Sequence, residues 1–529
     1  MKPDNRGEAI HTLIEYLTFS NKHHRLKSYD MLDCWTVSRE AITSQSARIP
    51  KVGPADDMSE CTYPNPSSDD LPILYRDSTP RDKFLDSVWG HVFNHRRATD
   101  SRVPRAVVHA TSTSHVVAAV KLANRLRCRV SVRSGGHSWA AWSGLEYDER
   151  TRILSCPPSA TGRMANKFLE GKGRLFAGGH CPDVGLGGFL LQGGMGWNCK
   201  NWGWACESIV GLDAVTADGR VVYASQGENV DLFWAARGAG PGFPAIVTRF
   251  YLMTRPLPEL YQSVYIYPIS EYRKVLQWVI DMCKVGDTDT EMVAVGQYIP
   301  EYPDPVILAN FLTFKPDRAQ GEAALRPLHD DPNRPPNPLI EVFARPTSLP
   351  DQYAPQEVAN PEGHRYCSEN AYIRNDEEDV PAVLEEAFTT LPHRKAMALY
   401  FGMAPTSRRA HYTAQVDGDD DNDFVGSMAL SMQSDHYFAL YTVWENPEED
   451  ERCTAWTHGV MRGVERFSEG SYLGDADFQH RRTKFWRDGN ARRLMEVRRK
   501  WDPEGRICGY LDQGDRSGVE GLKNEFEWE

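Results

Sequence analysis

Two glycine-rich segments place a histidine and a cysteine where the backbone can wrap around a ligand. The first segment is Arg133-Ser134-Gly135-Gly136-His137-Ser138, and the second runs from Gly178 through His180 and Cys181 to Gly188. Adjacent glycines let the main chain approach a flat or phosphorylated ligand closely, and the imidazole after them is presented at that surface. The predicted chemistry is therefore the holding of a large planar ligand.

Each of these residues also has an ordinary structural alternative. Taken alone, His137 is a structural histidine after a glycine turn, and Cys181 is a small buried hydrophobic residue. His180 beside Cys181 suggests a metal pair or a Cys/His nucleophile, but adjacent residues in an extended chain point to opposite faces, so neither is expected. The run at 185–196 has the spacing of neither a P-loop nor a GxGxxG motif, and those phosphate sites are not expected.

The two segments resemble the flavin-attachment motifs of the berberine bridge enzyme-like FAD-linked oxidases, whose fold is shared with vanillyl-alcohol oxidase. The similarity extends over residues 105–255 and 470–514. It implies one FAD held covalently twice, by His137 at the flavin 8α-methyl group and by Cys181 at C6. Two such links raise the reduction potential of the flavin and fix its ring, which makes hydride removal from a poor donor easier.

The resemblance also implies which other residues contact the cofactor. They come from both segments and from one later strand: Arg133, Ser134, Gly135, Gly136, Ser138, Val184, Gly185, Gly187, Gly188, Gly193 and Val215. Val184 stands at the position where the family has a gatekeeper residue for O2. In having valine at this position, the chain resembles the oxidase members of the family. O2 is therefore the expected electron acceptor and H2O2 the expected product, with a dehydrogenase that uses another acceptor as the alternative.

A substrate oxidised by flavin generally needs a base for its O–H or N–H proton. The family implies a base on the substrate-domain sheet or in a C-terminal tyrosine motif, and each candidate tyrosine is also a plausible half-buried packing residue. The candidates are Tyr441, Tyr437, Tyr472 and Tyr510, with Gln433 and Glu445 as polar neighbours. The predicted function is oxidation of a small organic substrate such as an alcohol, an amine or a secondary metabolite.

The chain departs from the family in three places. His137 and Cys181 are closer together in the sequence than in the family, as though a strand after Ser143-Gly144 were missing. Loss of a strand exposes sheet edges, so an inactive remnant is a second alternative. Prolines at 241 and 244 remove amide donors from a loop near the flavin. Segments 471–475 and 510–514 match the closing tyrosine motif only in part.

The elements that must position these residues need more than one core. The chain has 529 residues, and hydrophobic cores stop growing at roughly 250 to 300 residues. We expect an α+β protein: a PCMH-type FAD-binding domain of two α/β subdomains, and an α+β substrate domain with a large antiparallel sheet. The expected divisions are an extension (1–80), the FAD-binding domain (81–254), the substrate-binding domain (255–465) and a C-terminal segment that returns to the FAD-binding domain (466–529).

Local patterns agree with this division. A strand at 106–110, helix caps at 111–114, a helix over 115–126 and a strand at 129–133 form a βαβ-like order. An Asp-Gly turn at 218–219 predicts a hairpin, followed by a short helix at 231–238 and a strand at 245–254. After residue 256, strands such as 436–444 alternate with helices.

Composition excludes several other classes. The formal net charge of −13 disfavours nucleic acid and anionic membranes as partners. There is neither a signal-like segment nor a run of 18 apolar residues, so an intracellular, membrane-free protein is expected. The 11 cysteines lack CxxC spacing and the acidic run 417–424 lacks the EF-hand pattern, so no metal is expected. The expected partners are a small-molecule substrate and O2, and the oligomeric state is left open.

Overall fold

Two antiparallel sheets form the framework of the described part of the chain. The computed structural model describes residues 71–90, 94, 95, 98, 103–134, 144–403, 427–477, 480–509 and 524–526. These residues all belong to one unit, Pro66–Glu529. Five of the residues predicted for the site lie outside the described residues: Gly135, Gly136, His137, Ser138 and Tyr510.

The larger sheet has eight antiparallel strands and forms the second half of the unit. Its order is β13 (Ile340–Thr347), β10 (Glu259–Pro268), β12 (Val306–Lys315), β11 (Thr290–Gln297), β15 (Met397–Gly402), β16 (His436–Trp444), β14 (Arg365–Ile373) and β17 (Ser468–Gly470). Successive side chains of a strand point to opposite faces. On β16, Tyr437 and Ala439 therefore join one hydrophobic core, whereas Phe438 and Leu440 join another.

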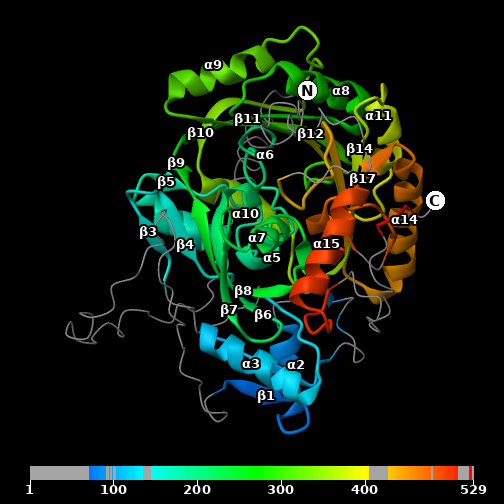
Figure 1. The fold of residues 1–529 in the computed structure, drawn as a ribbon. Helices are drawn as coiled ribbons and strands as arrows, with labels where there is room; N and C mark the ends of the chain where they lie inside the picture. The colour runs from blue at the N-terminus through cyan, green and yellow to red at the C-terminus, as the bar shows by residue number, and fades with distance from the viewer. Residues whose placement is uncertain are drawn as a thin grey trace, which may run out of the picture. The chain divides into compact units, whose positions relative to one another are not determined.

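Helices cover the face of this sheet that carries Phe438 and Leu440. They are α8 (Tyr272–Val285), α9 (Arg318–His329) and α14 (Asp450–Glu465). Figure 1 shows α8 and α9 along the strands β10, β11 and β12. The opposite face, with Tyr437, belongs to the same hydrophobic core as residues of the smaller sheet such as Leu212 and Phe250. The α+β class and the large antiparallel sheet are confirmed.

The smaller sheet has five antiparallel strands in the order β3 (Glu146–Asp148), β4 (Ile153–Cys156), β8 (Ala245–Met253), β6 (Ile209–Thr216) and β7 (Val221–Ser225). The hairpin predicted at the Asp-Gly turn is β6–β7, and Gly219 has φ +85°, a conformation that favours glycine. The predicted helix and strand after it are α7 (Val230–Ala235) and β8.

The predicted βαβ-like unit is only partly regular. Strand β2 (Ala106–Val108) is followed by α3 (Thr113–Leu126), whose first turn is capped by the Ser112 hydroxyl. Strand β2 pairs with β1 (Ile73–Tyr75), which is antiparallel to it and precedes α2 (Arg81–Trp89). The strand predicted at 129–133 is wrong: only Val130 pairs, with Ile507. Val132 is 48% exposed, so its side chain has no core that would extend the pairing.

The end of the described chain contacts elements that precede residue 255. Helix α15 (Asp488–Trp501) contacts α7, and Ile507 pairs in parallel with Val130. The buried guanidinium of Arg498 donates to the carbonyl oxygens of Gly242, at 2.8 Å, and of Ile507, at 3.1 Å. A buried charge needs such partners to offset its desolvation. Arg498 thus fixes this C-terminal segment on the earlier part of the chain.

Candidate active site

Cys181 lies in a bend between α4 (Gly162–Glu170) and α5 (Leu186–Leu191). Arg163 of α4 holds this bend through two hydrogen bonds to the Asp183 carboxylate, of 2.9 and 2.8 Å. The amide nitrogen of Asn360, just after α10 (Leu349–Ala359), donates to the Cys181 sulfur at 3.7 Å. Burial, followed by the charges of Asp475 and Asp183, raises the pKa of the Cys181 thiol to about 12.

The two glycine-rich segments meet at Gly187. A Cβ atom on Gly187 would lie 2.1 Å from Ser134 Oγ and 2.9 Å from Pro158 Cβ, so only glycine fits between them. The Gly187 amide donates to the Pro158 carbonyl at 2.8 Å and therefore does not point outward as a phosphate donor. The neighbouring Gly188 faces open space. This contact places Ser134, at the start of the first segment, against the helix that follows Cys181.

The other residues predicted to contact the cofactor lie in different surroundings. The Arg133 guanidinium donates to the Val88 and Ser87 carbonyls, at 2.6 and 3.0 Å, and so anchors the end of α2. Gly193 has φ +111° and packs against Leu430, and Val215 is fully buried against α3. Gly185 pairs with Thr161.

Two of the predicted tyrosines converge on one carboxylate, Asp475. The Tyr437 hydroxyl donates to Asp475 Oδ2 at 2.5 Å, and the Tyr441 hydroxyl also forms a hydrogen bond with Asp475. Burial raises the pKa of Asp475, while the two phenols lower it. Burial also holds the pKa of both tyrosines well above the ordinary value. The phenols are therefore protonated donors, and Asp475 is the group that can accept a proton.

The two tyrosines differ in access. Tyr437 is fully buried, whereas Tyr441 is partly exposed. The charges of Asp475 and Cys181 both raise the pKa of Tyr441, which places these three residues in one electrostatic environment. Within this cluster, Tyr441 is therefore less enclosed than Tyr437.

Tyr472 binds the glycine-rich chain that follows α5. Its hydroxyl oxygen accepts hydrogen bonds from the Gly194 and Met195 amides, at 3.1 and 3.2 Å, and its own amide donates to the Asn370 side chain at 2.7 Å. These bonds fix the turn Leu473–Asp475 against the glycine-rich chain that follows α5. Tyr472 thus contacts the second glycine-rich segment through bonds that occupy its oxygen.

Several residues of this cluster were not predicted from the sequence. Asn360 and Glu291 carry no motif, Asp475 ends the partly matched segment 471–475 without a predicted role, and each comes from a part of the chain far from Cys181. His180 Nε2 lies 2.9 Å from Glu291 Oε1 on β11, and the other carboxylate oxygen accepts from the Asn198 amide at 2.8 Å. Only the three-dimensional arrangement brings these groups to the bend that carries Cys181.

The residues that are present fit FAD. Val184, in the bend after Cys181, leaves an apolar side chain 48% exposed, and Gly188 faces open space beside it. Gln433, predicted as a polar neighbour of the base, is buried, yet neither its amide nitrogen nor its amide oxygen is hydrogen-bonded. A buried polar group without a partner is unfavourable unless a ligand satisfies it. A flat cofactor with polar edges meets both requirements.

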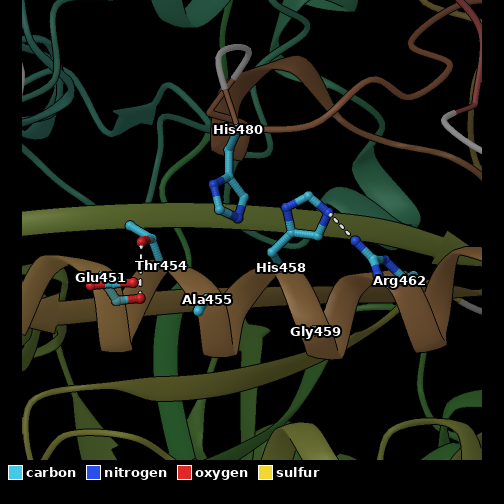
Figure 2. A pocket seen from close by; sticks show the side chains of 7 residues that line it. All are labelled: Glu451, Thr454, Ala455, His458, Gly459, Arg462 and His480. Atoms are coloured by element: carbon cyan, nitrogen blue, oxygen red, sulfur yellow. Dashed lines mark hydrogen bonds between the residues drawn. The ribbon is translucent and has the colours of Figure 1, made fainter.

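A cavity of about 490 Å³ lies elsewhere in the described chain. It is lined by residues of α14 and by His480, and Figure 2 shows the imidazoles of His458 and His480 facing each other there. Residues of α14 pack on the Phe438 face of the large sheet. Tyr437 points to the opposite face. The cavity is therefore separated by the sheet from the cluster around Cys181.

Comparison with known proteins agrees with this geometry. A family described as FAD binding domain matches residues 104–225. The FAD-linked oxidoreductase nodO of Hypoxylon pulicicidum is 35% identical over 460 residues, which cover 84% of this chain and 98% of the relative. This chain belongs to the FAD-linked oxidoreductase family. It is an FAD-dependent oxidoreductase, and its cofactor is FAD, as predicted.

More distant relatives share the fold of this FAD-linked oxidoreductase. The glucooligosaccharide oxidase of Sarocladium strictum is 33% identical over 205 residues, covering 36% of this chain and 39% of the relative. The solved glucooligosaccharide oxidase of Acremonium strictum superposes with a TM-score of 0.68 at 18% identity, covering 87% and 97% of the two chains. A berberine bridge enzyme-like protein of Physcomitrella patens gives 0.68 at 15% identity, covering 86% and 97%. The predicted PCMH-type fold is confirmed.

Two further observations concern the described residues alone. None of their helices has both the length and the apolar character needed to cross a membrane. Within the same residues, His, Cys, Asp and Glu side chains form no group of three that could bind a metal ion.

Proposed function

We propose that this oxidoreductase holds FAD covalently through His137 and Cys181 and oxidises a small alcohol, amine or secondary metabolite with O2, giving H2O2. The proposal rests on the hydrogen bonds that Tyr437 and Tyr441 form with Asp475. Together with burial, the charge of Asp475 also raises the pKa of the Cys181 thiol. The glucooligosaccharide oxidase of Acremonium strictum, of the same fold, is described with a 6-S-cysteinyl, 8α-N1-histidyl FAD. That protein supports the double attachment proposed here.

Bound FAD supplies the acceptor for the hydride that leaves the substrate carbon. The residues of the chain handle the proton. Tyr441, partly exposed and bonded to Asp475, accepts the substrate O–H or N–H proton and passes its own phenol proton to the carboxylate. Tyr437 donates to the same carboxylate from the buried side and fixes its orientation. Low pH protonates Asp475 and stops this transfer.

The proposed domains follow the two sheets. All strands of the five-stranded sheet lie between residues 146 and 253, which supports an FAD-binding domain at 81–254. Seven of the eight strands of the larger sheet lie between 259 and 444, which supports a substrate-binding domain at 255–465, and the edge strand β17 lies just beyond that boundary. The contacts of α15 and Ile507 support a C-terminal segment that completes the FAD-binding domain.

The test is a screen of purified protein in air against alcohols, amines and oligosaccharides, with H2O2 detected by a peroxidase-coupled dye. We expect H2O2 from at least one class of compound. The Tyr441→Phe variant should lose that signal while it keeps its covalent flavin. A variant that turns over as fast as the unmodified protein would exclude Tyr441 as the proton acceptor. Turnover with an artificial electron acceptor but not with O2 would support the dehydrogenase alternative.

A further inference from the structure

His180 is held in one orientation by two residues of the large sheet and by Trp197. Its Nε2 atom lies 2.9 Å from Glu291, a carboxylate that is almost fully buried. Its ring lies 4.2 Å from that of Trp197 and 5.6 Å from that of Phe401, measured between centroids. A carboxylate bonded to one ring nitrogen fixes the tautomer, so that the other nitrogen keeps its lone pair, as in catalytic triads. Nδ1 is then the nitrogen that can accept a proton.

The neighbouring Cys181 thiol needs such an acceptor. Burial and the carboxylates of Asp475 and Asp183 disfavour the thiolate there. The thiolate, rather than the thiol, is the reactive form of cysteine. Residues 180 and 181 lie in a bend, and both interact with the large sheet: His180 contacts Glu291, and Cys181 interacts electrostatically with Tyr441. The Asn360 amide already donates to the sulfur.

We propose that His180, oriented by Glu291, takes the proton of the Cys181 thiol when Cys181 is joined to FAD, and that the Asn360 amide stabilises the thiolate. The inference rests on the double attachment proposed above. In the overall step the S–H bond and the C6–H bond of the flavin break and the sulfur–C6 bond forms. The two electrons and two protons released pass to O2, which becomes H2O2. His180 acts in this step as the first holder of the thiol proton.

The charges around the pair predict effects of opposite sign. His180 faces Glu291 from β11 and Asp475 from the turn after β17, and the Asp475 charge is in turn compensated by His180. Cys181 faces Asp475, Asp183, Tyr366 and Tyr441. Loss of His180 should slow attachment because the acceptor is gone. Neutralising Asp475 should leave attachment unchanged or make it faster, because a charge that opposes the thiolate is removed.

The experiment uses the full chain expressed under riboflavin limitation, then mixed with FAD in air. Bond formation is followed by the mass of the tryptic peptide Leu175–Lys200, which contains Cys181. His180→Asn should slow attachment by about 100-fold, the lower range for loss of a general base. Its rate should then rise about tenfold per pH unit, because the thiolate fraction does so below the pKa. Added imidazole should restore part of the rate.

Matched variants separate proton transfer from loss of structure. Glu291→Gln keeps a hydrogen-bonding group at His180 without its charge, and should slow attachment less than His180→Asn does. His329→Asn removes a histidine that lies 3.9 Å from Glu341 at the outer edge of the large sheet, and should have no effect. Asp475→Asn should not slow attachment. Slower attachment in Asp475→Asn together with a normal rate in His180→Asn would assign the proton to Asp475 and overturn the inference.

The outcome also separates this inference from the proposed function. If the unmodified chain never gains FAD on the Cys181 peptide, the double attachment and the inference both fail. If it does, and His180→Asn gains FAD at the same rate, only the inference fails. A rate in His180→Asn that is lowered equally at every pH and is not restored by imidazole would mean that His180 has a purely structural role, which also overturns the inference.

Discussion

Replacing Gly187 by alanine perturbs the contact that joins the two glycine-rich segments. An added Cβ would lie 2.7 Å from Ser134 Cβ and 2.9 Å from Pro158 Cβ. Neither atom is the end of a flexible side chain, so the backbone of one segment must shift. Overpacking of this kind typically destabilises by about 1 to 3 kcal/mol. That range corresponds to an unfolded fraction about 5 to 150 times larger.

The neighbouring glycine provides the control. Gly188 lies in the same helix, and an added Cβ there would meet nothing within 4 Å. Gly188→Ala should therefore be neutral or slightly stabilising, because alanine is a better helix former than glycine by up to about 1 kcal/mol. The assay is urea unfolding followed by brief proteolysis, which reports the unfolded fraction of both variants and of the unmodified chain.

The same assay can refute the reasoning. If Gly187→Ala and Gly188→Ala have equal stability to within about 0.5 kcal/mol, the usual range for surface substitutions, Gly187 does not pack against Ser134. Ser134 would then lie elsewhere, and the proposal that both segments bind one cofactor would lose the support of this contact.

Three further predictions test the site and one buried ion pair of the large sheet. Tyr441→Phe should lower kcat/KM about 100- to 10,000-fold for any compound that the unmodified enzyme oxidises, with a smaller loss in the buried Tyr437→Phe, and equal losses would contradict the assignment. Burial raises the pKa of Glu369 from its ordinary 4.5 to about 8, although the charge of Arg481 lowers it. Between these two values the folded state keeps a proton that the unfolded state has lost, so the free energy of unfolding should fall as the pH rises from about 4.5 to about 8. Glu369→Gln should remove this slope in urea midpoints taken at pH 5 and pH 8, and an unchanged slope would contradict it. Val184→Leu should suppress turnover with O2 but not with an artificial acceptor, and an unchanged O2 rate would argue against a gatekeeper role.

The sequence predicted those parts of the site that short-range patterns encode. Cys181 stands in a dense glycine motif, and Gly187 proved to be a position where no side chain fits. Tyr437 and Tyr441 are four residues apart on a strand, so the two-residue period of a strand already places them on one face. The Asp-Gly hairpin and the helix capped by Ser112 were predictable for the same local reason.

Contacts between distant segments were not predictable. Glu291 is one acidic residue among 73 Asp and Glu in the chain, and only the pairing of β11 within the large sheet brings it to His180. Asp475 is the last residue of the partly matched segment 471–475, but its partners lie more than thirty residues earlier on β16. The strand predicted at 129–133 was wrong because its alternating valines suggested a second buried face, whereas Val132 is exposed.

Covalent attachment of FAD is tested most directly by the intact mass and visible absorbance of the acid-precipitated, washed protein. We expect a yellow pellet with the mass of one FAD added. We also expect FAD to remain bound in His137→Ala and in Cys181→Ala singly and to be lost when both are replaced. A colourless pellet of unmodified mass, with no flavin in the supernatant, would contradict covalent attachment and favour an inactive remnant.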